Sequence, residues 1–414
     1  MDDKDETIRD VRSCEAVVVG TGPAGLAGAL ALKHVGADVV LIGPPPARSQ
    51  GQRAETRTAA LLVSSIDFLK TLKVFDRLKP VAAPLTAIRI IDVSRSLVRA
   101  PDIEFRASEL GLEAFGYNIA NTALVEALYS RAQEVLPAIL PTTVEHVLID
   151  ERNVRLACTG GSQVSGRLVM AADGRRSLCR EAARIEVSEW RYDQGAIASD
   201  FRHSRPHRGV AIELHREGAS LTTVPLPDPC GSALILVGST AEIGRLIQCD
   251  EERFAESLAD RLDGLLGSIE SVGPRASFPV AGLTAKTLAA RRIALVGEAG
   301  HILPPIGAQG LNLGLRDAAA LADCIAEALV RRADPGGEDV LSAYNDARRL
   351  DVLSRAVGVD LLNRSLLTDF VPLQAARGIV LHGLNWLPPL RRLVMRVGLE
   401  PPSSLPRLMR GAQA

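Results

Sequence analysis

The sequence predicts a mixed α/β fold, in which strands alternate with helices, a separate β-sheet is inserted, and helices follow at the C-terminal end. Three observations support this class. Residues 16–36 pass from a short apolar run through a glycine-rich turn into helical spacing, and residues 293–329 repeat that order. Between them, residues 190–280 carry longer strand-like runs. We therefore expect one α/β unit, built from distant parts of the chain, with a strand-rich insertion.

Composition narrows the class of protein. The 414 residues are 47% hydrophobic, and 48 Lys and Arg balance 49 Asp and Glu. Such a chain can bury a large core, and we expect two domains with an appendage. A neutral balance with only 3% aromatic residues offers neither a basic face nor stacking platforms, so nucleic acid is not an expected partner.

Cysteine, histidine and apolar patterns predict a cytoplasmic protein without a metal site. The six cysteines form no C-x-x-C pair, and His203, His207 and His215 lie among arginines rather than clustered carboxylates. The N-terminal residues are acidic, and no uncharged apolar run reaches about 18 residues.

The first glycine-rich segment has the spacing of a dinucleotide-binding turn. Residues 16–19 form the expected strand, the letters GTGPAG follow, and helical spacing runs to a stop at Gly36. One glycine makes such a turn, a second lets pyrophosphate approach, and a third lets the helix pack on the strand. The sequence therefore predicts a Rossmann-like cofactor site that includes Gly20, Gly22, Ala24 and Gly25.

One part of that pattern is missing. The second strand, residues 39–42, is expected to end in an acid that binds the adenosine ribose. Gly43 stands there instead, followed by three prolines. The ribose contact must come from elsewhere, and the sequence leaves Arg48 and Gln52 as open candidates.

The later strand-turn-helix segment suits a flat anionic ligand. Residues 293–296 read as a buried strand, and Glu298 follows with a carboxylate that could accept hydrogen bonds from hydroxyl groups. Pro304 and Pro305 then exclude a helix.

The backbone after these prolines is expected to be unshielded by side chains. Gly307 and Gly310 let main chain approach a planar group, and helical spacing begins at Leu311. We expect Leu311 and Asn312 to present free N–H groups at the positive end of this helix, where an anion binds.

The order of these features resembles the second FAD motif of the para-hydroxybenzoate hydroxylase-like flavoproteins, which are single-component aromatic hydroxylases. Their pattern is G-D-A-x-H, prolines, then G-x-G-x-N; here the letters are GEAGH, PP and GAQGLN. Glu298 replaces the usual Asp and Gly300 the usual Ala. A longer carboxylate still reaches a ribityl hydroxyl, so the resemblance implies the same role with altered geometry.

A third segment resembles another motif of the same flavoproteins. Three short strands, residues 144–149, 154–158 and 167–170, lead into the letters ADGRRSLCR. The resemblance implies that Asp173 and Gly174 bind the ribityl or pyrophosphate part of FAD. Arg176 and Arg180 are either contacts for NAD(P)H or solvated charges at a helix start.

Two single residues remain open between a cofactor role and a structural one. In the flavoproteins that this chain resembles, an arginine at the position of Arg57 lies near the cofactor. Arg57 could instead be a surface charge. Asn121 opens a helical stretch and is either a helix cap or a cofactor contact.

The C-terminal region reads as helices. Its letters from Tyr344 to Arg349, then VDLLNRSLLTDFVPLQAARG and PLRRLVMRVG, resemble the ubiquinone-biosynthesis hydroxylases, and the resemblance spans nearly the whole chain. In the letters PPLRRLVMRVG, the apolar stripe is Leu390, Leu393 and Val397, with Arg391, Arg392 and Arg396 off the stripe. We expect a helix that caps the fold, with peripheral contact to the inner membrane or a quinone-biosynthesis complex as alternatives.

The expected division of the chain follows these segments. The FAD-binding domain takes residues 13–84, 111–186 and 284–332, the substrate domain takes 85–110 and 187–283, and the C-terminal helical region takes 340–414.

The resemblance implies an NAD(P)H-dependent flavoprotein monooxygenase. Its FAD, once reduced, adds oxygen as a flavin 4a-hydroperoxide and hydroxylates a phenolic, polyprenylated ring in ubiquinone biosynthesis. The carbonyl of Pro305 faces the substrate hydroxyl, Gly307 shares that loop, and the helix end at Asn312 stabilises negative charge on reduced flavin. The alternatives are another phenolic substrate, a flavin-dependent prenyl reductase and a non-catalytic scaffold subunit; the oligomeric state is left open.

Overall fold

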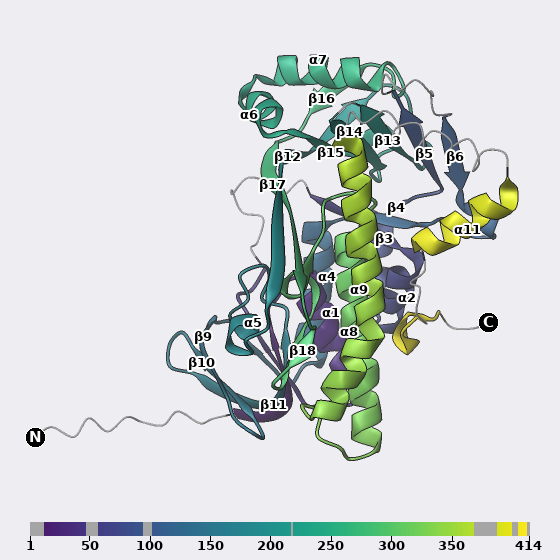
Figure 1. Cartoon of the computed structure of the whole chain (residues 1–414). Helices are drawn as coiled ribbons and strands as arrows, with labels where there is room; N and C mark the ends of the chain where they lie inside the picture. The colour runs from purple at the N-terminus through teal and green to yellow at the C-terminus, as the bar shows by residue number, and fades with distance from the viewer. Residues whose placement is uncertain are drawn as a thin grey trace, which may run out of the picture.

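The computed structural model describes residues 12–46, 57–93, 102–216, 218–367, 387–399 and 405–411. Two large β-sheets lie at opposite ends of the molecule, and the long helix α9 (Glu338–Leu367) runs along both (Figure 1). The fold is mixed α/β, as the sequence predicts.

The first sheet is built around parallel strands in the order β19, β11, β1, β2 and β8. Their apolar residues are buried as continuous runs, which is typical of parallel strands covered on both faces. The strands of this sheet are β1 (Arg12–Val19), β2 (Val39–Ile42), β8 (Ala138–Leu140), β9 (Val144–Ile149), β10 (Val154–Cys158), β11 (Gln163–Ala171), β18 (Ala289–Ala290) and β19 (Ile293–Leu295).

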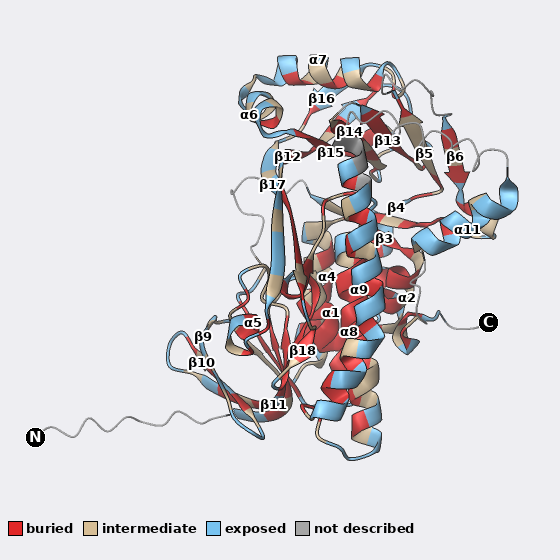
Figure 2. Cartoon of the chain, in the orientation of Figure 1, coloured by how far each residue is buried: buried red, intermediate tan, exposed pale blue. Residues whose placement is uncertain are grey.

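Helices cover this sheet and form the largest core. Helix α1 (Pro23–His34) packs against both α4 (Asn121–Val135) and α8 (Gln309–Val330), and α9 packs against α8. Red buried residues concentrate where these helices meet the sheet (Figure 2). The short α5 (Leu178–Ala182) follows β11.

The second sheet has the order β20, β17, β12, β15, β14, β13, β5 and β6, with β16 beside β12. Helices α6 (Thr240–Gln248) and α7 (Glu251–Leu262) pack on it and close a separate core. Its strands are β5 (Ala87–Asp92), β6 (Ile103–Arg106), β12 (Val187–His203), β13 (Val210–Arg216), β14 (Ala219–Pro225), β15 (Gly231–Ser239), β16 (Ile269–Val272), β17 (Ala276–Ala285) and β20 (His301–Ile302).

A small third sheet joins β3 (Thr58–Leu62), β7 (Gly116–Ala120) and β4 (Ala83–Pro84). Helices α2 (Val63–Thr71) and α3 (Phe75–Leu78) follow β3. Within the described ranges, no helix is both long and apolar enough to cross a bilayer.

One predicted helix start needs correction. The late glycine-rich helix begins at Gln309, two residues before the predicted start at Leu311. Helix α7 ends at Leu262, where Asp263 adopts the left-handed conformation (φ 47°).

Candidate cofactor site

Three segments predicted to bind the cofactor follow three neighbouring parallel strands. The turn at Gly20 follows β1, Asp173 follows β11, and Gly297 follows β19 shortly after its last residue. Because β1, β11 and β19 are parallel neighbours, their carboxyl ends lie at one edge of the sheet. Ligands of open α/β sheets bind in the crevice at such an edge.

The first turn fits against the third segment only because it lacks side chains. Gly20 has φ +117°, and a Cβ there would lie 2.2 Å from the carbonyl oxygen of Ala172. A Cβ on Gly25 would lie 2.1 Å from the carbonyl oxygen of Gly20. Both positions therefore require glycine, for turn formation and for close packing of helix on strand.

The second segment meets the first through small residues. A Cβ built on Gly297 would lie 3.4 Å from the Cβ of Ala24, and one on Gly314 of α8 would lie equally close to it. Ala24 therefore packs between the turn at Gly297 and the start of α8.

Arg180 joins the third segment to the second. Only 5% of Arg180 is exposed, and its guanidinium donates to the carbonyl oxygens of Ala299 (2.9 Å) and Arg175 (2.9 Å). The expectation that Arg180 is a solvated charge or an NAD(P)H contact is wrong, because its donors are directed into the protein. Arg176, by contrast, is exposed.

One carboxylate oxygen of Asp173 accepts a hydrogen bond within the protein, and the other has no partner. Its Oδ2 accepts a hydrogen bond from the backbone N–H of Cys179 at 3.1 Å, at the start of α5. Its Oδ1 is buried and has no hydrogen-bond partner. A buried acceptor without a donor is costly, so this atom suits a ligand hydroxyl, such as those of a ribityl chain.

Bare backbone borders the same edge of the sheet. Cβ atoms built on Gly22, Gly174 and Gly310 meet no protein atom within 4 Å. These are the positions where the sequence predicts close approach of the cofactor. Together with the free oxygen of Asp173, this open space fits the pyrophosphate and ribityl parts of FAD.

The missing ribose acid has a local steric reason. A Cβ on Gly43 would lie 2.7 Å from Cγ2 of Thr21, whose hydroxyl donates to the carbonyl oxygen of Pro44 at 2.6 Å. Thr21 thus occupies the space that a larger side chain at position 43 would need. The two open candidates for the ribose contact, Arg48 and Gln52, lie outside the described residues.

Arg57 and Asn121 lie side by side. The N–H of Asn121 donates to the carbonyl oxygen of Arg57 at 3.0 Å, where β3 and β7 pair. Asn121 is the first residue of α4, and Ala120 occupies the N-cap position, so the cap interpretation of Asn121 is wrong. The predicted cofactor contacts of both residues stay predictions.

Because α8 starts earlier than predicted, its free N–H groups belong to earlier residues than expected. Because the helix begins at Gln309, its unpaired donors belong to Gln309, Gly310 and Leu311. The N–H of Asn312 falls within the ladder, four residues after Ala308. The expectation of a free N–H on Asn312 is therefore wrong, whereas that on Leu311 agrees with the helix bounds.

The buried side chain of Asn312 links α8 to β3 through hydrogen bonds. Only 1% of Asn312 is exposed, and its Oδ1 accepts from the N–H of Leu62 (2.9 Å) and the hydroxyl of Ser65 (2.7 Å). Its Nδ2 donates to the carbonyl oxygens of Ala60 (2.8 Å) and Ala308 (2.7 Å). All its hydrogen-bonding capacity is used, so this side chain holds the loop in place.

The proline loop connects β20 to α8. Pro305 is half-buried, Gly307 is exposed with φ +64°, and Ala308 has φ +53°. Ile306 between them is 4% exposed and packs with Val359 of α9. The loop is thus anchored on one side and open on the other. Glu298, on the turn before β20, is also exposed.

A buried charge network, which sequence reasoning missed, supports the second segment. Asp317 of α8 is fully buried, and its Oδ2 accepts from the N–H of Gly297 (3.0 Å) and from Nε2 of His301 (2.6 Å). Its Oδ1 accepts from Nε of Arg348 at 2.7 Å. Burial alone would raise the pKa of Asp317, but the charges of His301 and Arg348 and these hydrogen bonds lower it.

The network continues along α9. Asp351 accepts from Arg348 (2.8 Å) and Arg316 (2.6 Å), and Tyr344 donates to the carbonyl oxygen of Leu295 at 2.7 Å. The sequence did contain a signal for this network. Arg316 and Asp317 lie within an otherwise apolar helix face, and buried charges there require partners.

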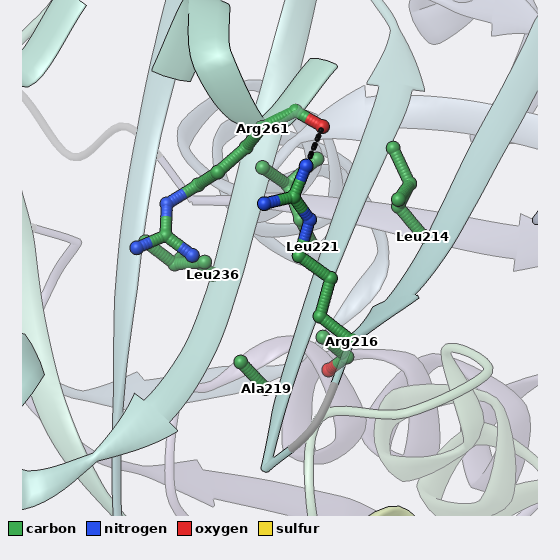
Figure 3. Close-up of a pocket in the computed structure, with 7 residues that line it drawn as sticks. Leu214, Arg216, Ala219, Leu221, Leu236 and Arg261 are labelled. Carbon is green, nitrogen blue, oxygen red and sulfur yellow. Dashed lines mark hydrogen bonds between the residues drawn. The ribbon is translucent and has the colours of Figure 1, made fainter. Parts of the chain in front are cut away.

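The second sheet has a hollow that does not belong to this site. It lies beside Leu214, Leu221 and Leu236, where Arg216 donates to the carbonyl oxygen of Arg261 at 3.5 Å (Figure 3). Its volume of about 10 Å³ suffices for one water molecule and not for a phenol.

Sequence comparisons place the chain among flavoproteins. The family described as FAD binding domain matches residues 13–357. The ubiquinone hydroxylase UbiL of Rhodospirillum rubrum is 32% identical, over 96% of this chain and 92% of its own length. The ubiquinone hydroxylase UbiM of Neisseria meningitidis is 27% identical, over 92% of this chain and 84% of its own length.

Solved structures show the same fold with different chemistries. The p-nitrophenol 4-monooxygenase PnpA from Pseudomonas putida has a TM-score of 0.74 at 19% identity, over 95% of this chain and 100% of its own. The Diels-Alderase PyrE3 has a TM-score of 0.71 at 19% identity, over 95% and 82%. This likeness shows the fold alone.

The family match and the relative at 32% identity carry the assignment, and the free oxygen of Asp173 with the open backbone at Gly22 and Gly310 agrees with it. This chain therefore belongs to the FAD-binding family of flavoprotein monooxygenases, in the branch of the ubiquinone hydroxylases.

Proposed function

We propose that this enzyme hydroxylates a phenolic, polyprenylated ring in ubiquinone biosynthesis, with NAD(P)H as the reductant of its FAD. The observation that carries the proposal is the meeting of the three cofactor segments at one sheet edge, beside a half-buried proline loop. Relatives named ubiquinone hydroxylases, and one from Escherichia coli named 3-demethoxyubiquinol 3-hydroxylase, support this substrate class. When bound, FAD supplies oxygen activation and transfer.

The protein positions the cofactor and stabilises charge. Oδ1 of Asp173 accepts from a ribityl hydroxyl, and the backbone at Gly22 leaves room for pyrophosphate. The free N–H groups of Gly310 and Leu311 point from the positive end of α8 and stabilise an anion there. The exposed carboxylate of Glu298 is a further acceptor for ligand hydroxyls.

The substrate is assigned to the open side of the proline loop, where Gly307 and Ala308 are exposed. In this assignment residues 85–110 and 187–283 form the substrate domain, and the carbonyl of Pro305 accepts from the phenol hydroxyl. The packing of Ile306 on Val359 supports it, because this contact fixes the loop from behind. A fixed wall holds the reacting carbon in line for oxygen transfer.

Pro305→Ala should separate oxygen consumption from hydroxylation. Alanine relaxes φ and lets the loop adopt other conformations, while the groups assigned to FAD remain unchanged. A phenol displaced by about 1 Å loses roughly a hundredfold in transfer, so product per NAD(P)H should fall roughly tenfold or more. Product, hydrogen peroxide and consumed NAD(P)H are measured together.

The control for this variant is Pro206→Ala, because Pro206 is exposed and lies in the second sheet's region away from the loop. If Pro305→Ala forms as much product per NAD(P)H consumed as the wild type, the loop does not position the substrate. No NAD(P)H oxidation by the wild-type protein would favour a scaffold subunit, and oxidation without peroxide or oxygen uptake would favour a prenyl reductase.

A further inference from the structure

Exposed apolar side chains are unevenly distributed over the described residues. Thirteen large hydrophobic residues are exposed there, and nine of them belong to α9 or to α11 (Pro388–Leu399) and the residue before it. Both helices show exposed stretches in Figure 2. The nine are Leu350, Leu353, Val357, Leu361, Leu387, Leu390, Leu393, Val394 and Val397.

On α9 these residues form a single stripe. Leu350, Leu353, Val357 and Leu361 follow one another at intervals of three or four residues, so they lie on one side of the helix. Their exposed fractions are between 49% and 65%. The opposite side is buried in the protein, so the stripe faces outward.

Helix α11 is held to the protein by its other side. Arg391 pairs with Glu109 at 2.7 Å and lies over the ring of Phe105 at 4.9 Å, and Met395, one turn later, is 7% exposed. The predicted apolar stripe of Leu390, Leu393 and Val397 therefore faces away from the fold. The helix packs on the fold as expected, but through Arg391 and Met395 rather than through this stripe.

A specific contact holds the two helices together. The guanidinium of Arg355 on α9 donates to the carbonyl oxygens of Val397 (3.0 Å) and Gly398 (3.1 Å), at the end of α11. These carbonyls are among those left free at a helix C-terminus. This contact makes α9 and α11 neighbours, and we call their exposed apolar residues together the α9–α11 face.

The charges of α11 indicate what this face contacts. The helix carries three arginines and no acidic residue, and Arg392 and Arg396 are exposed beside the stripe. An apolar stripe flanked by arginines is typical of helices that lie in the headgroup layer of anionic membranes. A two-fold contact between copies of this chain would bury these arginines against a helix that carries no acidic residue to pair with them.

We propose that the α9–α11 face docks on the surface of an anionic lipid bilayer. Its leucines and valines enter the boundary of the acyl chains, while Arg392 and Arg396 contact lipid phosphates. The proposal rests on the proposed function, because a polyprenylated phenol resides in the bilayer. Ile306 of the proline loop packs on the same helix at Val359, on the side away from the stripe, so α9 lies between the loop and the docked surface.

Vesicle flotation of the FAD-loaded protein tests this docking. Wild-type protein should float with phosphatidylcholine vesicles containing phosphatidylglycerol, and much less with phosphatidylcholine alone. L393E/V397E on α11 and L353E/V357E on α9 should each lower vesicle affinity by roughly tenfold or more. R392Q should lower it by roughly fivefold, and added salt should reduce that difference.

The matched control is L148E, since Leu148 of β9 is 62% exposed and lies on the first sheet. It should bind vesicles as wild type does. Absence of wild-type flotation at low salt, or an equal loss in L148E, overturns the proposal. So does a change from dimer to monomer in the stripe variants without lipid, because the face would then be an interface between copies.

Hydroxylation of a water-soluble, short-chain phenol separates this proposal from the proposed function. The stripe variants should keep that activity and their bound FAD while losing flotation. If the wild-type protein floats but hydroxylates no phenol, the proposed function fails and the docking face stands. If it hydroxylates the soluble phenol but does not float, only the docking face fails.

Discussion

Asp317→Asn should destabilise the protein by about 3–5 kcal/mol, because it removes a fully buried carboxylate that pairs with the guanidinium of Arg348. Asp317 is fully buried, and its carboxylate is the partner of His301 and of the guanidinium of Arg348. The substitution also weakens the acceptor for the N–H of Gly297, at the turn that bears Glu298. We therefore expect FAD to dissociate more readily as well.

Equilibrium unfolding in urea at neutral pH measures this effect. Asp346→Asn is the control, because Asp346 is exposed on α9 near the same network. A loss below about 1 kcal/mol would show that the buried network is not a main support of the second segment.

The pH dependence of unfolding gives an independent check. The pKa of Asp317 in the folded protein lies below its ordinary value of 3.8. Its contribution to stability is therefore complete above that pH and decreases as the pH falls through the lowered pKa. In Asp317→Asn this part of the acid-induced loss of stability should be absent.

Asp173→Ala should weaken FAD binding about tenfold or more. The substitution removes an acceptor whose Oδ1 is buried without a protein partner, and a hydrogen bond to a charged group contributes about 1.5–3 kcal/mol. Titration of the apoprotein with FAD gives the dissociation constant, and circular dichroism reports whether the fold is retained.

Asp193→Ala is the matched control, because Asp193 is exposed on β12. Unchanged affinity in Asp173→Ala would remove the third segment from the cofactor site. A loss in both variants would point to a general effect on folding.

The strands around the cofactor site were predictable because their signal is local. The strand at residues 39–42 has the predicted bounds, and β1, β11 and β19 contain or closely match the predicted runs. Parallel strands covered on both faces are continuous apolar runs, and glycines mark their ends. Gly20 and Gly25 could likewise be assigned from the turn that they build.

The start of α8 could not be predicted in this way. Ala308, a residue without a special preference for positive φ, adopts φ +53° immediately before the helix. It is held there by Asn312, whose other partners on β3 and α2 lie about 250 residues earlier in the chain. Such long-range contacts leave no periodic signal in the sequence.

Charged residues account for the other differences. The sequence offered Arg180 as a solvated charge or an NAD(P)H contact and gave no role to Arg348 or Asp317. Each is buried because partners from distant segments satisfy it. On α11 the assumption that arginines face solvent places the wrong face of the helix against the protein. The side chain that anchors the helix is Arg391, which pairs with Glu109.

The most direct test of the account is hydroxylation under ¹⁸O₂. Purified FAD-loaded protein is supplied with NADH or NADPH and a short-chain prenylphenol, and the product is analysed by mass spectrometry. A hydroxylated ring that carries one ¹⁸O atom should form, and only when oxygen is present. A product oxygen that comes from water, or a reduced prenyl chain formed without oxygen, would contradict this prediction.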